Sequence, residues 1–180
     1  MNITVHDKTF EPFLSEEQID NRVRELAARI SEDYAGKRPL FLGVLNGSFV
    51  FAADLFRRIT VEAEISFVKL ASYKGTSSTG SVVTAIGLEE SLHERHVIIV
   101  EDIIDTGRTM HHFLKEVNRS GPASVRIATF LSKPEAIEVS DVSADYIGFE
   151  IPTKFVLGYG LDYDGLGRNL PELYTLVGGE

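Results

Sequence analysis

The chain has 180 residues, of which 43% are hydrophobic and 25% are charged, and its formal net charge is −9. This length suits one domain with a substantial hydrophobic core, and the acidic balance argues against nucleic acid as the main partner. The sequence has no cysteine, no signal-peptide core behind Met1 and no apolar run of the roughly 18 residues that a membrane span needs. We therefore expect a cytoplasmic protein that does not bind membranes.

The N-terminal part begins with a helix pattern. Ser15 and Gln18 form a capping-box pair, and apolar residues then recur at helical spacing, which predicts an amphipathic helix over residues 15–34. The segment PLFLGVLNGSFVF predicts a strand, a tight turn and then a helix that ends at about Arg58. VEAEISFVKLASY alternates and predicts a strand, and VVTAIG predicts the strand that returns beside it. The small polar residues 74–81 between them are typical of a mobile loop.

The second half of the chain alternates strands and helices. HVIIV is a continuous apolar run, as expected for a strand buried on both faces. Apolar residues on one helical face follow it before Gly121, and SVRIATFLS and DYIGFEI predict two further strands around a short helix-compatible segment. This alternation predicts an α/β fold with a mainly parallel central sheet flanked by helices.

We find no internal repeat and no linker, so we expect one domain over residues 1–180. Its core should span about 35–150. The less regular segments 1–14 and 151–180 should form a small cap over one end of the sheet.

An acidic stretch, VIIVEDIIDTGRTM, follows the apolar strand. Adjacent carboxylates at Glu101 and Asp102 are costly unless a cation or a hydroxylated ligand uses them. Ligands of parallel sheets bind beyond the carboxyl ends of the strands. The turn from Asp105 to Thr109, with Gly107 allowing close backbone approach, would form a phosphate cradle at a helix N-terminus. The pattern suggests a ligand with hydroxyls and phosphate, such as a ribose 5-phosphate. Alternatively, Asp105 merely caps the helix.

This stretch resembles the phosphoribosyl pyrophosphate (PRPP) signature of type I phosphoribosyltransferases. Further segments match the hypoxanthine-guanine branch of that family in order and spacing: GVLNGSFVFAADL, SYKGTSSTG, LSKPEA and GFEIPTKFVLGYGLDYDGLGRNLPEL. The resemblance implies the type I phosphoribosyltransferase fold, in which the terminal segments form a hood. It also implies a purine salvage enzyme that transfers the phosphoribosyl group of PRPP to hypoxanthine or guanine, giving IMP or GMP and pyrophosphate.

The resemblance assigns roles along the acidic stretch. Glu101 and Asp102 would contact the ribose hydroxyls, beside a metal ion. Asp105 would be the general base that accepts the purine N7 proton. The 5-phosphate would be held by the residues that follow it, Thr106, Gly107, Arg108 and Thr109.

The family uses Mg²⁺ to neutralise pyrophosphate, so Glu101, Asp102 and Asp162 are the expected metal-binding carboxylates. Arg168 would add a bidentate phosphate contact. Without the resemblance, Asp162 would be an ordinary turn carboxylate, and Arg168 would be a surface cation paired with Glu172.

Two segments should contact pyrophosphate or close over it. Leu45, Asn46 and Gly47 resemble the turn that presents backbone N–H groups through a non-proline cis peptide. Many relatives carry Lys where this chain has Asn46, so no side-chain cation is expected there; LNGS could also be an ordinary turn. Ser72 and Tyr73 head the loop that would form a lid, although it could be a disordered hairpin tip.

The base pocket implied by the resemblance has Lys154 donating to the purine 6-oxygen and Phe155 stacking on the ring. The other members are Ile103, Lys133 and Val156. Taken alone, the Lys-Phe pair would be a surface lysine beside a core phenylalanine. Adjacent histidines at 111 and 112 should be exposed helix residues rather than metal ligands, because neighbouring helix positions face different ways.

The sequence leaves two alternative functions. The same fold can serve as a nucleotide-sensing RNA-binding regulator, but that needs a basic surface. A xanthine-preferring enzyme is the second possibility, because backbone groups mainly read the exocyclic group at C2. The family suggests a homodimer or a homotetramer.

Overall fold

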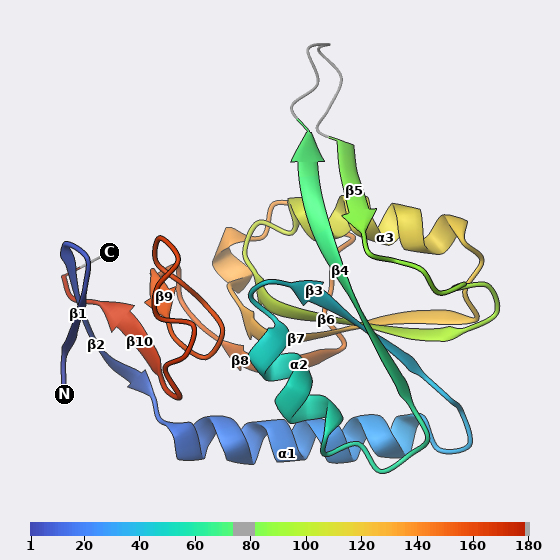
Figure 1. Ribbon diagram of the computed structural model, residues 1–180, viewed down its shortest axis with the longest axis horizontal. Coiled ribbons are helices and arrows are strands. Elements are labelled where there is room, and N and C mark those ends of the chain that lie inside the picture. Colours follow the sequence, from blue (N-terminus) through green and yellow to red (C-terminus); the bar gives the residue numbers. More distant parts are fainter. Residues whose placement is uncertain (74–81, 179–180) are drawn as a thin grey trace.

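The computed structural model describes residues 1–73 and 82–178. Its centre is a six-stranded sheet with the order β5-β4-β3-β6-β7-β8 (Figure 1). Five strands are parallel, and β5 pairs antiparallel with β4 at the edge. The strands are β3 (Leu40–Leu45), β4 (Glu64–Tyr73), β5 (Val82–Ile86), β6 (His96–Ile104), β7 (Ser124–Ser132) and β8 (Tyr146–Glu150).

Helices cover both faces of this sheet, as predicted. They are α1 (Glu16–Asp33), α2 (Phe49–Phe56), α3 (Arg108–Arg119) and the short 3-10 helix η1 (Pro134–Ala136). Ile98 and Val100 of β6 pack in the cluster that contains α1 and α2, whereas Val97 and Ile99 pack with α3 on the other face. Among the described residues, none of the helices is both long and apolar enough to cross a membrane.

The local signals in the sequence explain where these elements begin. Ser15 caps α1, because its Oγ accepts a hydrogen bond from the Gln18 N–H at 3.2 Å and the Gln18 side chain accepts one from the Ser15 N–H at 2.9 Å. β6 runs beyond its apolar stretch to Ile104, because its pairing with β7 continues to Ser132. The acidic pair therefore lies within a strand rather than after one.

The terminal segments form a second, antiparallel sheet with the order β1-β2-β10-β9, which we call the hood (Figure 1, left). Its strands are β1 (Ile3–Val5), β2 (Lys8–Leu14), β9 (Val156–Leu157) and β10 (Leu173–Leu176). Its small core is formed by Phe10, Leu157 and Tyr174. The predicted cap from the two ends of the chain is thus confirmed.

Candidate active site

The acidic pair is reachable because two neighbouring strands end at different levels. Pairing of β6 with β3 stops at Val100, opposite Gly43, whereas pairing with β7 continues. β3 ends at Leu45 and the chain turns into α2, so Glu101 and Asp102 follow the point where β3 stops pairing. The sheet thus opens at its carboxyl edge, where ligands of parallel sheets bind.

A small cavity of about 120 Å³ lies at the turn into α3. Its wall consists of Glu101, Ile103, Ile104, Asp105, Thr106, Gly107, Thr109 and Met110. Gly107 is the N-cap of α3 with a φ of +80°. The Arg108 N–H at the helix start donates to Thr106 Oγ1 at 3.4 Å, whereas the Asp105 carboxylate contacts Lys133, so the interpretation of Asp105 as a cap is wrong. The Arg108 side chain is exposed and forms an ion pair with Glu138 outside this wall. The cradle is therefore formed by the backbone of the turn and the start of the helix.

A second cavity of about 220 Å³, which we call the base cavity, adjoins the first and shares Ile103 and Asp105 with it. Its other lining residues are Asp102, Lys133, Phe155, Val156, Leu161 and Asp162. Lys133 is 9% exposed, and its Nζ lies 3.1 Å from Oδ2 of Asp105, so the cation holds this carboxylate at the cavity. Four of the five predicted base-binding residues are brought together here.

The fifth predicted base-binding residue, Lys154, does not line this cavity. Its Nζ lies 6.0 Å from the centre of the Phe13 ring, in a cation–π geometry. Phe155 is 44% exposed, so the alternative interpretation of it as a core residue is wrong. An exposed aromatic ring beside a cavity is suited to stacking on a planar base.

The turn after β3 is packed tightly on both sides. The Leu45–Asn46 peptide is cis, as the resemblance implied. A Cβ added to Gly47 would lie 1.6 Å from Oδ2 of Asp102, and a Cβ on Gly160 would lie 2.3 Å from the Gly47 carbonyl oxygen. Only glycine permits both approaches. The turn is thereby fixed between the acidic pair and the hood segment.

Arg168 and Asp162 are not independent surface residues, because they form an ion pair with each other. Arg168 Nη2 lies 2.6 Å from Asp162 Oδ1, and Nη1 donates to the Gly160 carbonyl at 2.7 Å. The predicted alternative partner, Glu172, instead accepts a hydrogen bond from Tyr174. Asp162 also accepts a hydrogen bond from the Gly165 N–H at 2.7 Å, so it is a turn carboxylate as well as a cavity residue.

The acidic pair is electrostatically unfavourable without a ligand. The pKa of Glu101 is raised well above its usual value, mainly because the carboxyl group is removed from solvent and secondly because of the negative charge of Asp102. Within residues 1–73 and 82–178, no three acidic or histidine side chains converge into a ready metal site, so the three predicted carboxylates do not form one. Asp102 and Asp162 nevertheless line one cavity. This donor set fits Mg²⁺, which typically takes one or two carboxylates and fills its remaining positions with substrate oxygens and water.

Two further predictions concern neighbouring segments. Ser72 and Tyr73 end β4, and the lid expected over residues 74–81 lies outside the described part of the chain. His111 and His112 are both partly buried, so the prediction that they are exposed is wrong, and His111 Nδ1 lies 2.8 Å from a carboxylate oxygen of Asp141. Sequence reasoning missed Leu161 in the base cavity and Gly160 against the turn. The run Gly158-Tyr159-Gly160 was the signal, since paired glycines often mark a close backbone approach.

Comparison with known proteins agrees with this geometry. The model of the phosphoribosyl transferase domain matches residues 14–164. The chain therefore belongs to the phosphoribosyltransferase family. It is 44% identical over 163 residues to a hypoxanthine-guanine phosphoribosyltransferase of Streptococcus mutans, covering 90% of each chain. It is 43% identical over 172 residues to a hypoxanthine phosphoribosyltransferase of Buchnera aphidicola, covering 94% of this chain and 97% of that one.

Solved structures give the same result. A hypoxanthine phosphoribosyltransferase from Staphylococcus aureus superposes with a TM-score of 0.85 at 40% identity, covering 92% of this chain and 90% of that one. A hypoxanthine-guanine phosphoribosyltransferase from Bacillus anthracis, with a HEPES molecule in its active site, superposes with a TM-score of 0.83 at 38% identity. The match covers 93% of this chain and 96% of that one. Within its family, the chain thus falls in the hypoxanthine-guanine branch.

Proposed function

We propose that this chain is a purine salvage enzyme that transfers the 5-phosphoribosyl group of PRPP to hypoxanthine or guanine, releasing pyrophosphate. The observation that carries this proposal is the pair of adjoining cavities. One is a backbone cradle suited to a phosphate, the other is lined by a lysine and an exposed aromatic ring, and Asp105 lies in the wall of both. A phosphorylated sugar and a flat base would thus meet at this carboxylate.

The residues divide the reaction between them. The bond from ribose C1 to the pyrophosphate oxygen breaks, a bond from C1 to a purine nitrogen forms, and the proton on purine N7 passes to the Asp105 carboxylate. Lys133 orients that carboxylate through the 3.1 Å contact. Glu101 and Asp102 would hold the ribose hydroxyls, and their negative charge would stabilise the positive charge that develops on the sugar ring.

Pyrophosphate would leave between the Leu45–Gly47 turn and Arg168. The turn would contribute its backbone N–H groups, and Arg168 its guanidinium. Asp102 and Asp162 would hold Mg²⁺, which neutralises the charge of the pyrophosphate group when it is bound. Ser72 and Tyr73 would begin the lid that keeps water away from the reacting sugar.

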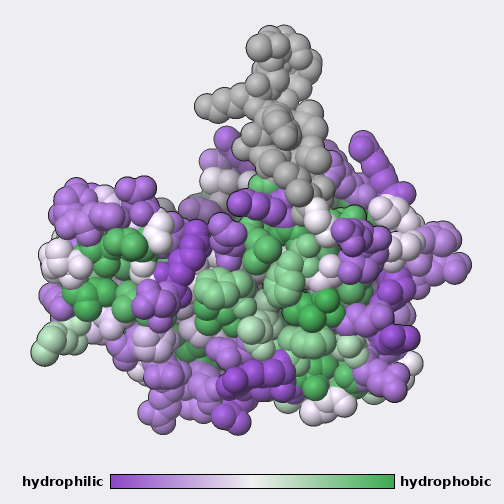
Figure 2. All heavy atoms as spheres, viewed as in Figure 1, coloured by the Kyte–Doolittle hydropathy of each residue, from purple (hydrophilic) through white to green (hydrophobic). Residues whose placement is uncertain are grey.

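A homo-oligomer is the assembly that we propose. Phe49, on the outer side of α2, is 43% exposed, and Val50, Phe56, Ile65 and Phe67 are only partly buried. Figure 2 shows apolar surface gathered over α2 and the neighbouring strands. Contiguous apolar surface of this kind is typical of an interface, and a second copy presenting the same face would cover it. Light scattering on the purified protein tests this proposal; a monomer at micromolar concentration would contradict it.

Initial rates with PRPP, Mg²⁺ and each base in turn test the proposed activity. We expect efficient use of hypoxanthine and guanine. A rate with xanthine that exceeds both would move the chain to the xanthine-preferring alternative. No transfer to any of the three bases, together with binding of RNA, would instead favour the regulator.

A further inference from the structure

Tyr159 has an unusual backbone for a large residue. It is 5% exposed, its φ is +48°, and the glycines on either side have φ values of +106° and +99°. A non-glycine residue in this region is strained and persists only where its surroundings hold it. Its ring packs 4.7 Å, centre to centre, from Phe130 of β7. The geometry is therefore imposed by contacts outside its own segment.

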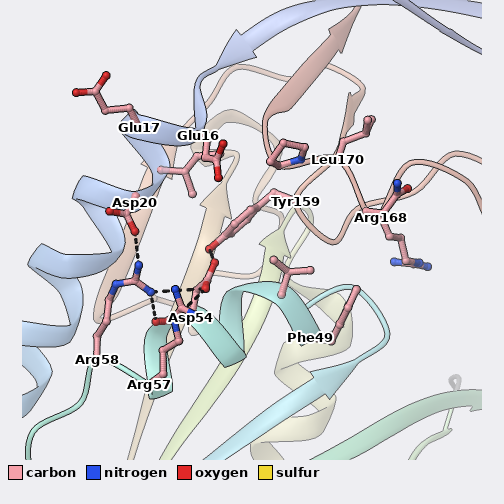
Figure 3. Close-up of a pocket in the computed structure, with 14 residues that line it drawn as sticks. Glu16, Glu17, Asp20, Phe49, Asp54, Arg57, Arg58, Tyr159, Arg168 and Leu170 are labelled. Atoms are coloured by element: carbon pink, nitrogen blue, oxygen red, sulfur yellow. Dashed lines mark hydrogen bonds and ion pairs between the residues drawn. The ribbon is translucent and has the colours of Figure 1, made fainter.

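The hydroxyl group of Tyr159 reaches a carboxylate on α2. It donates a hydrogen bond to Asp54 Oδ2 at 2.7 Å (Figure 3). Asp54 is itself held by arginines, because its Oδ1 lies 3.4 Å from Arg57 and 3.6 Å from Arg58. Arg58 also forms an ion pair with Asp20 of α1. The tyrosine thus connects the segment after β9 to a fixed point on the two helices.

This connection borders the pyrophosphate side of the site. Gly160, the next residue, donates its N–H to the Arg168 carbonyl at 3.0 Å, and its own carbonyl accepts from Arg168 Nη1. Gly160 also lies directly against Gly47, and α2 begins two residues after that glycine. The turn and the arginine are therefore joined twice, once at Gly160 and once through Tyr159.

We propose that Tyr159 is a positioning residue for the pyrophosphate half of the site. Its hydrogen bond to Asp54 sets the distance between the Leu45–Gly47 turn and Arg168, so that both reach the same ligand. It touches neither the base cavity nor the phosphate cradle. This inference rests on the proposed function. The alternative is that the bond only attaches the hood segment to the helices.

The test is Tyr159→Phe, which keeps the ring and removes the hydroxyl group. We expect the KM for PRPP, and for pyrophosphate in the reverse reaction, to rise about 10-fold, since a hydrogen bond to a charged group is lost. The KM for hypoxanthine should change less than about 2-fold, because Tyr159 does not line the base cavity and its hydroxyl group points to α2 instead. Tyr174→Phe is the matched control: it removes a hydroxyl that donates to Glu172 at 2.8 Å, and both KM values should stay unchanged.

Asp54 provides a rescue experiment. Asp54→Asn keeps an oxygen that accepts the tyrosine hydrogen bond and should raise the KM for pyrophosphate far less than Asp54→Ala does. Unchanged KM values in Tyr159→Phe, with only a lower melting temperature, would overturn the inference. If that variant does not fold, an equal effect of Asn and Ala at position 54 would overturn it instead. Failure of the wild-type enzyme to transfer phosphoribosyl groups would refute the proposed function itself, which is a separate result.

Discussion

The main sheet and the hood are built in opposite ways. Each residue from Val97 to Val100 of β6 is 0% exposed, between helices on both faces of the sheet. The hood has a three-residue core, and its long connection from β9 to β10 depends on glycines with positive φ. Burial on two sides can hold Glu101 and Asp102 where they repel. Close backbone packing in the hood instead brings Asp162, with its partner Arg168, to the cavity that Asp102 lines. The candidate site lies where the two regions meet.

Substrate choice distinguishes the contributions of the two regions most clearly, because each region supplies one lysine that could recognise the base. Lys133 follows β7 and lines the base cavity, whereas Lys154 precedes β9 and lies over Phe13. An ammonium group has only donors, so it pairs with the 6-oxygen of hypoxanthine and not with the amino group of adenine. We expect adenine to be rejected by about 10⁴-fold in kcat/KM.

Competition assays with Lys154→Gln and Lys133→Gln decide which lysine reads the base. The resemblance predicts that Lys154→Gln reduces the difference in kcat/KM between adenine and the 6-oxopurines, mostly by slowing the reaction of the oxopurines. If only Lys133→Gln reduces this difference, Lys133 of the main sheet recognises the 6-position and the predicted role of Lys154 is wrong. Equal use of adenine and hypoxanthine by the wild type would refute the oxopurine assignment.

Asp105 tests the chemistry of the main-sheet edge. Asp105→Asn keeps the shape of the side chain but cannot accept the purine proton, so kcat should fall by about 10²-fold or more. PRPP affinity should change much less. Single-turnover kinetics and equilibrium binding of PRPP measure the two quantities. Equal losses in both would make Asp105 a residue of the phosphate cradle.

Gly47 tests the junction between the two regions. In Gly47→Ala the new Cβ would meet the Asp102 carboxylate at 1.6 Å, so the turn must move. A displacement of about 1 Å can cost about 10²-fold in rate, and we expect kcat/KM for PRPP to fall by that order. Gly36→Ala is the control, because that glycine also has positive φ but has nothing within 4 Å of the added Cβ. It should lower the melting temperature and leave kcat/KM unchanged.

The hood carboxylate gives a smaller effect. Asp162→Asn should raise the Mg²⁺ concentration for half-maximal rate by about 10-fold, because one anionic contact to the metal is lost. Asp164→Asn, an exposed neighbour whose φ of +48° suits asparagine, should leave it unchanged. Titration of the rate with Mg²⁺ measures both. No shift in Asp162→Asn, or full wild-type activity after exhaustive chelation, would remove the metal from this part of the site.

The sequence predicted the main sheet well and the hood only as a cap. Apolar runs such as HVIIV follow from burial on both faces, and the Ser15–Gln18 capping box locates the start of α1 from local contacts alone. The arrangement of the hood depends on contacts between residues far apart in the sequence. The glycines around Tyr159 mark a close backbone approach but do not identify Gly47 as the partner of Gly160, and the placement of Lys154 over Phe13 has no local periodic signal. Resemblance could name the site residues, but only the fold shows which of them share a cavity.

The smallest expected effect is a gain in stability at the main-sheet edge. A carboxyl group with a raised pKa binds its proton more tightly in the folded state. The free energy of unfolding therefore falls as pH rises above about 4.3, the pKa of glutamate in the unfolded chain. Glu101→Gln removes that charge. Its melting temperature at pH 8 should exceed the wild-type value by ~2–4 °C, the shift that ~1 kcal/mol gives in a protein of this size.

The same substitution should raise the KM for PRPP, because it weakens the contact that we propose between Glu101 and the ribose hydroxyls. The difference in melting temperature should shrink near pH 4.5, where the wild-type carboxyl group is protonated in the folded protein. Scanning calorimetry at the two pH values without ligand measures it. A wild type that is more stable than Glu101→Gln at pH 8 would mean that the surrounding protein, rather than the substrate, compensates the charge of Glu101. The carboxylate would then be a structural feature of the sheet edge.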